Sequence, residues 1–434
     1  MSIIGLDIGT TTLSAVVRDE KTGLLIDRRT VPHGAFLPGL PFERIQDVSL
    51  IESLAMKLME ELSCLHGPLS AVGLTGQMHG VLYVDNEGEA VSPLYTWQDG
   101  RGDLPLEDGR SLAAALSEET GYPLASGFGC VTHASLLRSS RLPPRAACLS
   151  TIHAYIAMKL AGKKRPLLHA SDAASLGLYD LSARRFDRTA LAALRPEFFP
   201  ETTPTACMLG ETPSGAKVVS AIGDNQASFL GAMAGQDGGV LVNIGTGSQV
   251  SMKTGRLLTC PNCETRPLDG DEHLLVGAPL CGGRAYALLE KFLRECASLA
   301  GVPAGSLYER MNALALTAPE HPLTADARFC GTRANPALRG SITGLGEDNF
   351  TPHHFIHAVL TGMAEELHGY YLSMSSASGR PAETLVASGN AVRMNPALQK
   401  ILSEVFGMEL RVPAVLEEAA AGAAGLAGRT AGIL

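Results

Sequence analysis

A short glycine–threonine turn that occurs twice is the feature that most constrains the fold of this chain. The sequence Ile-Gly-Thr-Thr-Thr at residues 8–12 returns as Ile-Gly-Thr-Gly-Ser at residues 244–248. Short apolar, strand-like runs flank both copies, and this pattern predicts a β-hairpin at each place. One hairpin opens each half of a chain of 434 residues, which is long for one domain. The repeat therefore predicts two domains of similar topology that face a shared cleft.

The segments outside the two turns alternate between helical and strand-like patterns. This alternation predicts an α/β architecture. We place the domain boundary after a loop-like segment at residues 211–215, so that the domains span residues 1–218 and 219–434. The expected elements are strands over residues 3–8, 13–17, 71–75, 240–242, 250–252 and 385–388, helices over 49–65 and 396–406, and an alanine-rich helix over 417–427 in which Gly422 and Gly425 allow close packing.

Composition excludes several classes of partner. The net charge of −9 argues against nucleic acid, which usually requires a basic surface. Nine cysteines scattered through a long chain do not indicate a disulfide framework. The first residues contain no basic leader, and no apolar run reaches the roughly 18 residues that a membrane span needs. We therefore expect a cytoplasmic protein without a membrane partner.

The common nucleotide and hydrolase motifs are missing from the sequence. It contains no G-x-x-x-x-G-K-[ST] and no G-x-G-x-x-G, which excludes a P-loop kinase and the simplest dehydrogenases. It also lacks H-E-x-x-H and G-x-S-x-G, so the simplest zinc proteases and esterases are excluded. A single C-x-x-C at residues 260–263 has no second pair at zinc-finger spacing, and His273 and Cys281 are poorly placed to complete a site. We interpret it as an ordinary loop.

The two turns have the chemistry of phosphate-binding loops. Glycine lets the backbone approach an anion closely, and consecutive N–H groups and threonine hydroxyls supply donors. Asp7 precedes the first turn and would repel phosphate unless a cation intervened, which suggests a Mg²⁺ partner. The alternative is that Asp7 only caps the turn. The candidate phosphate-binding residues are Gly9, Thr10, Thr11, Gly245 and Thr246.

Asp224 follows an apolar strand at residues 220–223. A carboxylate at this position could accept the proton of an attacking hydroxyl during phosphoryl transfer. An aspartate after a glycine turn is also a common helix N-cap, and the residue pattern alone does not decide between the two roles.

Two further clusters suit the hydroxyl groups of a sugar. Gln77 and His79 follow the strand that ends at Gly76. Trp97, Asp99 and Arg101 bring the only tryptophan, a carboxylate and a guanidinium within five residues. Each cluster alone could be an ordinary loop, but together they favour a polyol site.

These motifs resemble the FGGY carbohydrate kinases of the actin–hexokinase superfamily, and the resemblance spans nearly the whole chain. It implies a fold of two ribonuclease H-like domains with an active-site cleft between them. It also implies that Asp224 is the catalytic base and that Gly389 and Asn390 belong to the adenosine loop. Ser388 and Asn390 depart from the glycine-rich family pattern there. The segments that carry the resemblance are residues 5–11, 76–80, 97–101, 223–225, 243–248 and 389–390.

Within this family, several segments are similar to the members that phosphorylate sedoheptulose. They are residues 46–48, 126–130, 173–177, 222–228 and 282–283. The resemblance implies transfer of phosphate from Mg-ATP to the terminal hydroxyl of a seven-carbon ketose. The alternatives are a pentulose kinase such as a xylulokinase, a non-catalytic sugar-binding regulator on the same fold, and an actin-like ATPase. The sequence leaves open whether the chain forms a homodimer.

Overall fold

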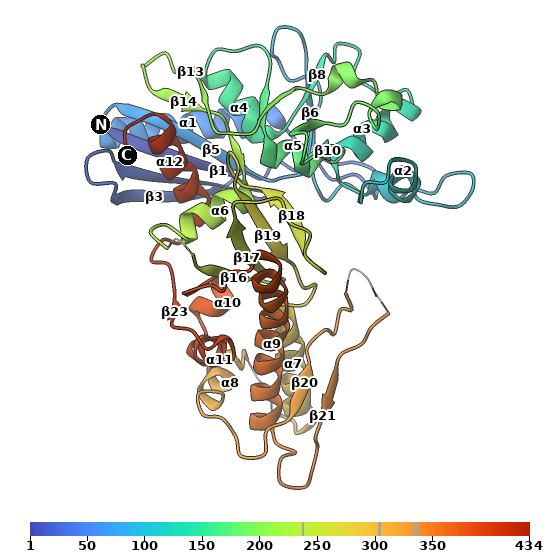
Figure 1. Ribbon diagram of the computed structural model, residues 1–434, viewed down its shortest axis with the longest axis vertical. Coiled ribbons are helices and arrows are strands. Elements are labelled where there is room, and N and C mark those ends of the chain that lie inside the picture. The colour runs from blue at the N-terminus through green and yellow to red at the C-terminus, as the bar shows by residue number, and fades with distance from the viewer. Residues whose placement is uncertain (237, 303–304, 333–334, 336) are drawn as a thin grey trace. The chain divides into compact units, whose positions relative to one another are not determined.

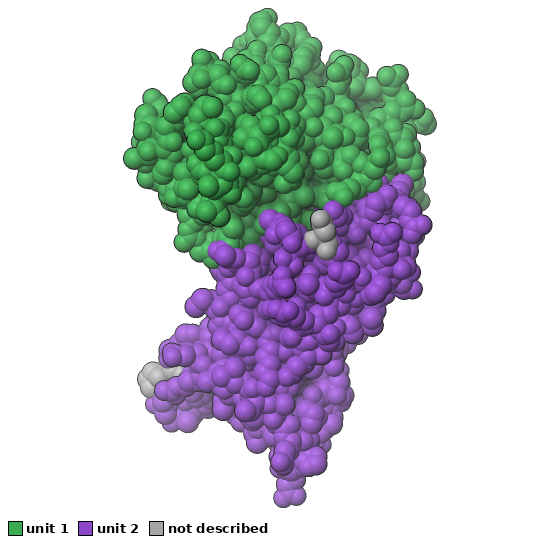
Figure 2. Space-filling model, turned by 60° about the vertical axis from the view of Figure 1, so that its left-hand side comes forward, with its two compact units in different colours: residues 1–231, 266–272, 415–434 green, residues 232–265, 273–414 purple. Residues whose placement is uncertain are grey.

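The computed structural model describes residues 1–236, 238–302, 305–332, 335 and 337–434. The chain divides into two compact units, coloured separately in Figure 2. Unit 1 comprises residues 1–231, 266–272 and 415–434, and unit 2 comprises residues 232–265 and 273–414. We predicted a single boundary after residue 218, whereas the chain passes from one unit to the other four times. The difference arises because the C-terminal segment packs in unit 1.

Unit 1 is built on a seven-stranded sheet of order β13-β14-β5-β1-β2-β3, with β15 also beside β5. The predicted first hairpin is confirmed, because β1 and β2 pair antiparallel around residues 9–11. Strands β1, β14 and β15 all run parallel to β5. The strands are β1 Ser2–Ile8, β2 Thr12–Asp19, β3 Leu25–Pro32, β5 Leu69–Gly76, β13 Met208–Glu211, β14 Lys217–Val219 and β15 Ile222–Gly223.

The two faces of this sheet are covered by helices from opposite ends of the chain (Figure 1). Alternate residues of β1 point to opposite faces, so Ile4 packs in the core that contains α1 Val48–His66. Ile3 packs in the core that contains α12 Glu418–Thr430. Both helices were predicted, and α1 begins where the Asp47 side chain accepts hydrogen bonds from two backbone N–H groups.

Glycines let the backbone of α12 pack directly against the backbone of neighbouring elements in unit 1. A Cβ on Gly422 would lie 1.9 Å from the Ala227 carbonyl oxygen, and one on Gly5 would lie 1.9 Å from that of Ala420. The close packing predicted for Gly422 is therefore confirmed. Gly425 differs, because a Cβ there would meet only the Arg429 side chain, at 3.4 Å.

The other elements of unit 1 are short, and many of them pack in a separate core that contains residues of α3, α4 and α5. The helices are α2 Leu112–Thr120, α3 Gly129–Arg138, α4 Ile152–Leu160, α5 Ala170–Leu176, α6 Asp224–Ala232, which continues to the first residue of unit 2, and the 3₁₀ turns Gly100–Asp103, Ala192–Leu194 and Pro196–Phe198. The strands are β4 Ile45–Gln46, β6 Leu82–Val84, β7 Leu94–Tyr95, β8 Cys148–Ser150, β9 Leu167–His169, β10 Tyr179–Asp180, β11 Arg185–Phe186 and β12 Glu201–Thr203.

Unit 2 contains a six-stranded sheet of order β18-β19-β17-β16-β22-β23. The second predicted hairpin is confirmed by the antiparallel pair β16 and β17. The strands are β16 Val240–Ile244, β17 Ser248–Thr254, β18 Glu264–Pro267, β19 His273–Gly277, β20 Thr324–Asp326, β21 Ser341–Thr343, β22 Leu385–Ser388 and β23 Leu410–Arg411. The helices are α7 Gly283–Leu299, α8 Tyr308–Leu314, α9 Pro352–Ser378, α10 Asn390–Arg393 and α11 Pro396–Phe406, the last with the predicted bounds.

The two sheets share one strand plan, as the repeated turn predicted. In unit 1 the order β14-β5-β1-β2-β3 has an antiparallel hairpin followed by two parallel strands on the side of β1. In unit 2 the order β23-β22-β16-β17-β19 repeats this arrangement on the side of β16.

Within the described part of the chain, no helix is long and apolar enough to cross a bilayer.

Candidate active site

The ends of three neighbouring strands of unit 1 bring together Asp7 and Asp224. In the parallel register, Ile8 of β1 and Gly223 of β15 both pair with Gly76, the last residue of β5. Asp7 precedes Ile8 and Asp224 follows Gly223, so the two carboxylates flank the end of β5. The carboxyl ends of parallel strands are the usual place for a ligand in open α/β sheets.

Burial and neighbouring charges shape the ionisation of both carboxyl groups. Burial is the largest cause that raises the pKa of Asp7 to about 7, and the charge of Asp224 adds to it. Burial likewise raises the pKa of Asp224 to about 6, although the charge of His153 and the Asn225 N–H act in the opposite direction. Asp224 is the first residue of α6, where the helix dipole also favours a negative charge. A carboxyl group with a pKa near 6 can act as a general base at neutral pH.

A buried histidine–aspartate pair, which the sequence analysis missed, lies beside these carboxylates. His153 in α4 and Asp172 in α5 are both fully buried, and His153 Nε2 lies 2.7 Å from Asp172 Oδ1. Burial lowers the pKa of His153, but the charge and hydrogen bond of Asp172, together with the charges of Asp224 and Asp7, outweigh it, so the net pKa is raised. His153 lies next to the strand ends, because a Cβ on Gly76 would be 2.9 Å from its Nδ1 atom.

The first glycine–threonine turn is held from within unit 1 by polar side chains. Gly9 N–H donates to the Thr12 carbonyl at 3.0 Å and closes the turn. Gln46 Nε2 donates to the Thr10 carbonyl at 2.7 Å, and Gln77 Nε2 donates to Gln46 Oε1 at 2.9 Å. Gln77, which we predicted to contact the sugar, thus lies beside the first turn. Gln46 was missed as a site residue, although its segment contributed to the family resemblance.

Trp97 contacts the first glycine–threonine turn, and His79 lies three residues after the end of β5. Trp97 Nε1 donates to Thr10 Oγ1 at 3.0 Å, while the side chain stays 47% exposed. His79 has a φ of 69°, an uncommon conformation for a residue other than glycine. Its Nδ1 atom lies 2.7 Å from the Ser175 carbonyl, and its ring stacks on Phe128 with centroids 4.6 Å apart.

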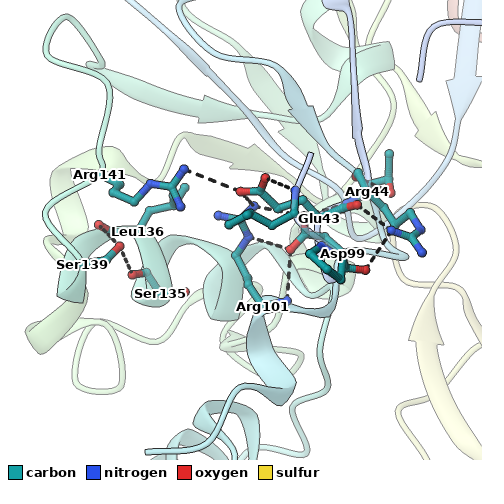
Figure 3. Close-up of polar contacts among 11 residues, drawn as sticks. Glu43, Arg44, Asp99, Arg101, Ser135, Leu136, Ser139 and Arg141 are labelled. Atoms are coloured by element: carbon teal, nitrogen blue, oxygen red, sulfur yellow. Dashed lines mark hydrogen bonds and ion pairs between the residues drawn. The ribbon is translucent and has the colours of Figure 1, made fainter. Parts of the chain in front are cut away.

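Asp99 and Arg101 are paired with each other in the interior of unit 1 (Figure 3). Arg101 donates to Asp99 through Nε at 2.6 Å and through its Nη2 atom at 3.0 Å, and both residues are at most 2% exposed. The Asp99 carboxylate also accepts a hydrogen bond from Arg44 N–H, and Glu43 lies 3.6 Å from both Arg101 and Arg141. These contacts favour a role in holding the loop, and the predicted sugar contact of this pair stays a prediction.

The second turn and its neighbours form a comparable site in unit 2. Gly245 N–H donates to the Gly247 carbonyl, and the first N–H groups of α7, from Gly283 and Arg284, donate to the turn. Gly389 has a φ of 91°, and a Cβ there would lie 2.4 Å from the Ile244 carbonyl. Only glycine therefore fits between the end of β22 and the turn. Thr246 is exposed, and Asn390 begins the short α10.

Comparison with known proteins identifies the class to which this arrangement belongs. The family models for the N-terminal and C-terminal domains of the FGGY carbohydrate kinases match residues 2–236 and 240–431. The chain therefore belongs to the FGGY family of carbohydrate kinases. These enzymes are phosphotransferases that act on an alcohol group, and ATP is their expected phosphoryl donor.

Individual members of the family are similar to the chain over most of its length. It is 28% identical to sedoheptulokinase from Homo sapiens over 94% of this chain and 93% of the relative. It is 27% identical to glycerol kinase from Trichlorobacter lovleyi over 99% of this chain and 90% of the relative. Among solved structures, xylulose kinase from Rhodospirillum rubrum matches with a TM-score of 0.83 at 22% identity, over 99% of this chain and 89% of the other. Glycerol kinase from Plasmodium falciparum with ADP matches at 0.81 and 17%, over 100% and 90%. These structures confirm the two-domain α/β fold.

Among the described residues, no group of three or more histidine, cysteine, aspartate or glutamate side chains is arranged to hold a metal ion. One carboxylate oxygen of Asp7, Oδ1, is nevertheless buried and has no hydrogen-bond partner among the described residues. A hard oxygen ligand of this kind suits Mg²⁺, which keeps several of its water ligands and needs few protein groups.

Proposed function

We propose that this enzyme transfers the γ-phosphoryl group of ATP to the terminal hydroxyl of a ketose, and that the ketose is sedoheptulose. The single observation that carries the reaction is the pair of carboxylates at the ends of β1 and β15. The choice of a seven-carbon ketose is supported by the sedoheptulokinase relative, whose similarity covers 94% of this chain.

Asp224 is proposed as the base that accepts the proton of the sugar hydroxyl. Its raised pKa supports this role, because a base with a pKa near the working pH can both accept and release a proton. In phosphoryl transfer the reacting groups are mainly positioned and stabilised electrostatically, so the base is needed late in the reaction. We propose that Gln77, His79 and Trp97, with the Asp99–Arg101 pair, hold the sugar.

Both glycine–threonine turns are proposed to bind the phosphates of ATP, through Gly9, Thr10, Thr11, Gly245 and Thr246. Their backbone N–H groups and hydroxyls are suitable donors. Gly389 and Asn390 are proposed to contact the adenosine. Asp7 would hold Mg²⁺ directly or through water, and the ion would supply positive charge against the phosphates.

A substrate panel tests this proposal. Release of ADP is measured with sedoheptulose, xylulose, ribulose and glycerol as separate acceptors, with wild-type enzyme and with Asp224→Asn. We expect the highest kcat/KM for sedoheptulose and a loss of turnover in the variant by about 10²- to 10⁴-fold. Preference for xylulose would support the pentulose kinase instead. Absence of sugar-dependent ADP release with all four acceptors would contradict the proposal and favour the non-catalytic sugar-binding protein or the actin-like ATPase. Near-normal turnover of the variant would exclude Asp224 as the base.

A further inference from the structure

The His153–Asp172 pair, which we term the buried dyad, has no evident structural reason for its position. His153 belongs to the first turn of α4, and Asp172 belongs to the first turn of α5. Both side chains are fully buried, and one imidazole nitrogen and one carboxylate oxygen pair at 2.7 Å. Replacing such a pair by apolar side chains often leaves a protein equally stable or more stable. Stability alone therefore does not explain why a polar pair lies here.

The unpartnered atoms of the dyad lie among those of the site. Within the described residues, His153 Nδ1, Asp172 Oδ2, Asp7 Oδ1 and Thr75 Oγ1 are all buried and have no hydrogen-bond partner. Asp7 and Thr75 are register partners on β1 and β5, so their side chains share one face of the sheet. Buried polar atoms without partners are rare and costly, and several at one place indicate water or a ligand.

Another buried histidine of unit 1 shows what a structural role looks like. His133 in α3 is also fully buried, but both of its ring nitrogens have partners. Nδ1 lies 2.8 Å from the Tyr83 hydroxyl, and Nε2 donates to the Leu194 carbonyl at 2.8 Å. The orphaned Nδ1 atom of His153 therefore distinguishes the dyad from ordinary core packing.

We propose that His153, oriented by Asp172, is a positioning residue for the phosphoryl transfer and supports the carboxylates of Asp7 and Asp224 from the buried side. This inference rests on the proposed roles of these two aspartates. Asp172 fixes one nitrogen of the imidazole, so the other nitrogen points at a defined place beside the strand ends. A Cβ at Gly76 would lie 2.7 Å from the Ile8 carbonyl and 2.9 Å from His153 Nδ1, so the absence of a side chain there leaves room for the ring.

The physical reason is that a base must be held at a fixed orientation to accept a proton in line with the attacking hydroxyl. Misplacement of a reacting group by about 1 Å can reduce the rate by about 10²-fold. Residues that orient the ligands of a metal ion typically contribute about 10- to 100-fold to affinity or activity, and we expect a positioning residue here to contribute on the same scale. The buried dyad should therefore affect kcat, and should leave the binding of ATP and sugar largely unchanged.

The test compares His153→Gln with the matched control His133→Gln, in the full-length enzyme with the best acceptor of the sugar panel. We expect His153→Gln to lower kcat by about 10- to 100-fold, with KM for ATP and for the sugar changed by less than about threefold. The control should keep the kcat of the wild type in its folded fraction, which the fluorescence of Trp97 reports. A kcat of His153→Gln within about twofold of wild type would overturn the proposal, as would an equal loss in both variants.

A second variant keeps the test decisive if His153→Gln does not fold. Asp172→Asn should give a similar loss of kcat, because it releases the imidazole without changing its size. The double variant should lose little more than either single variant, since residues that act as one unit are not additive. If the two single losses of kcat instead multiplied in the double variant, His153 and Asp172 would act independently, and the proposal would be contradicted. Asp224→Asn is measured in parallel: if it keeps turnover, the proposed base fails, whereas its loss together with normal His153→Gln activity refutes only this inference.

Discussion

Replacing Asp224 by asparagine is expected to stabilise unit 1 at neutral pH while it lowers turnover by about 10²- to 10⁴-fold. In the folded protein, burial raises the pKa of Asp224 from 3.8 to about 6. In the unfolded chain the same carboxyl group titrates near its ordinary value of about 3.9. The folded state therefore binds this proton more tightly than the unfolded state. Its free energy of unfolding is highest below both pKa values and falls as the pH rises from about 4 to about 6.

The size of the effect follows from the pKa difference. Each pKa unit corresponds to about 1.4 kcal/mol, so the ionised Asp224 destabilises the fold by about 3 kcal/mol above pH 6. Because Asp224 keeps part of its surface exposed, this figure is an upper value. The variant carries no charge, so its advantage over wild type should be near zero at about pH 4 and fully developed at about pH 7. Relief of the repulsion on Asp7 acts in the same direction.

Asp99→Asn is the matched control, since it makes the same substitution at a second aspartate of unit 1, one that is buried and ion-paired. Asp99 is fully engaged with Arg101 and with the Arg44 N–H group. Its replacement leaves Arg101 buried with a weakened partner, and breaking such a pair costs about 3–5 kcal/mol. The two variants should therefore change the free energy of unfolding in opposite directions at neutral pH.

Urea unfolding followed by tryptophan fluorescence measures this difference. Trp97 is the only tryptophan of the chain and belongs to unit 1, so the signal reports on the unit that contains both aspartates. Titrations of the three proteins at several pH values between about 4 and 8 give the dependence directly. The reasoning is refuted if Asp224→Asn unfolds at the same urea concentration as wild type at neutral pH. It is also refuted if the advantage of the variant does not shrink in acid.

Two further predictions concern the metal site and the packing of α12. Asp7→Ala should weaken magnesium-dependent ATP use much more than sugar binding, and calorimetry that shows the reverse would remove Asp7 from the metal site. Gly422→Ala should destabilise unit 1 by about 1–3 kcal/mol, because its Cβ would lie 1.9 Å from the Ala227 carbonyl oxygen. Gly425→Ala, three residues further along the same helix, should be neutral or stabilising by up to about 1 kcal/mol, because only the flexible Arg429 side chain is near. Equal urea midpoints for these two glycine variants would contradict the packing argument.

The features that depend on local sequence could be predicted from the chain alone. The two hairpins around residues 9–11 and 245–247 were predicted, because glycine and threonine between apolar runs favour a tight turn wherever they occur. Helix α11 has the predicted bounds Pro396–Phe406, since proline begins it and Gly407 ends it in a left-handed conformation. The repeat of the turn also predicted the shared strand plan of the two sheets.

Only the tertiary structure decided which polar side chains become partners. His153 and Asp172 belong to different helices, and no spacing in the sequence indicates that both lie behind the ends of β1, β5 and β15. Asp99 and Arg101 suited a sugar by residue type, but the loop folds so that they satisfy each other in the interior. Burial and pairing arise from contacts between distant segments, and they determine whether a carboxylate is neutralised or held ready to react. The types of residue that form the site could therefore be predicted from the sequence, whereas their ionisation and their partners depend on how distant segments pack together.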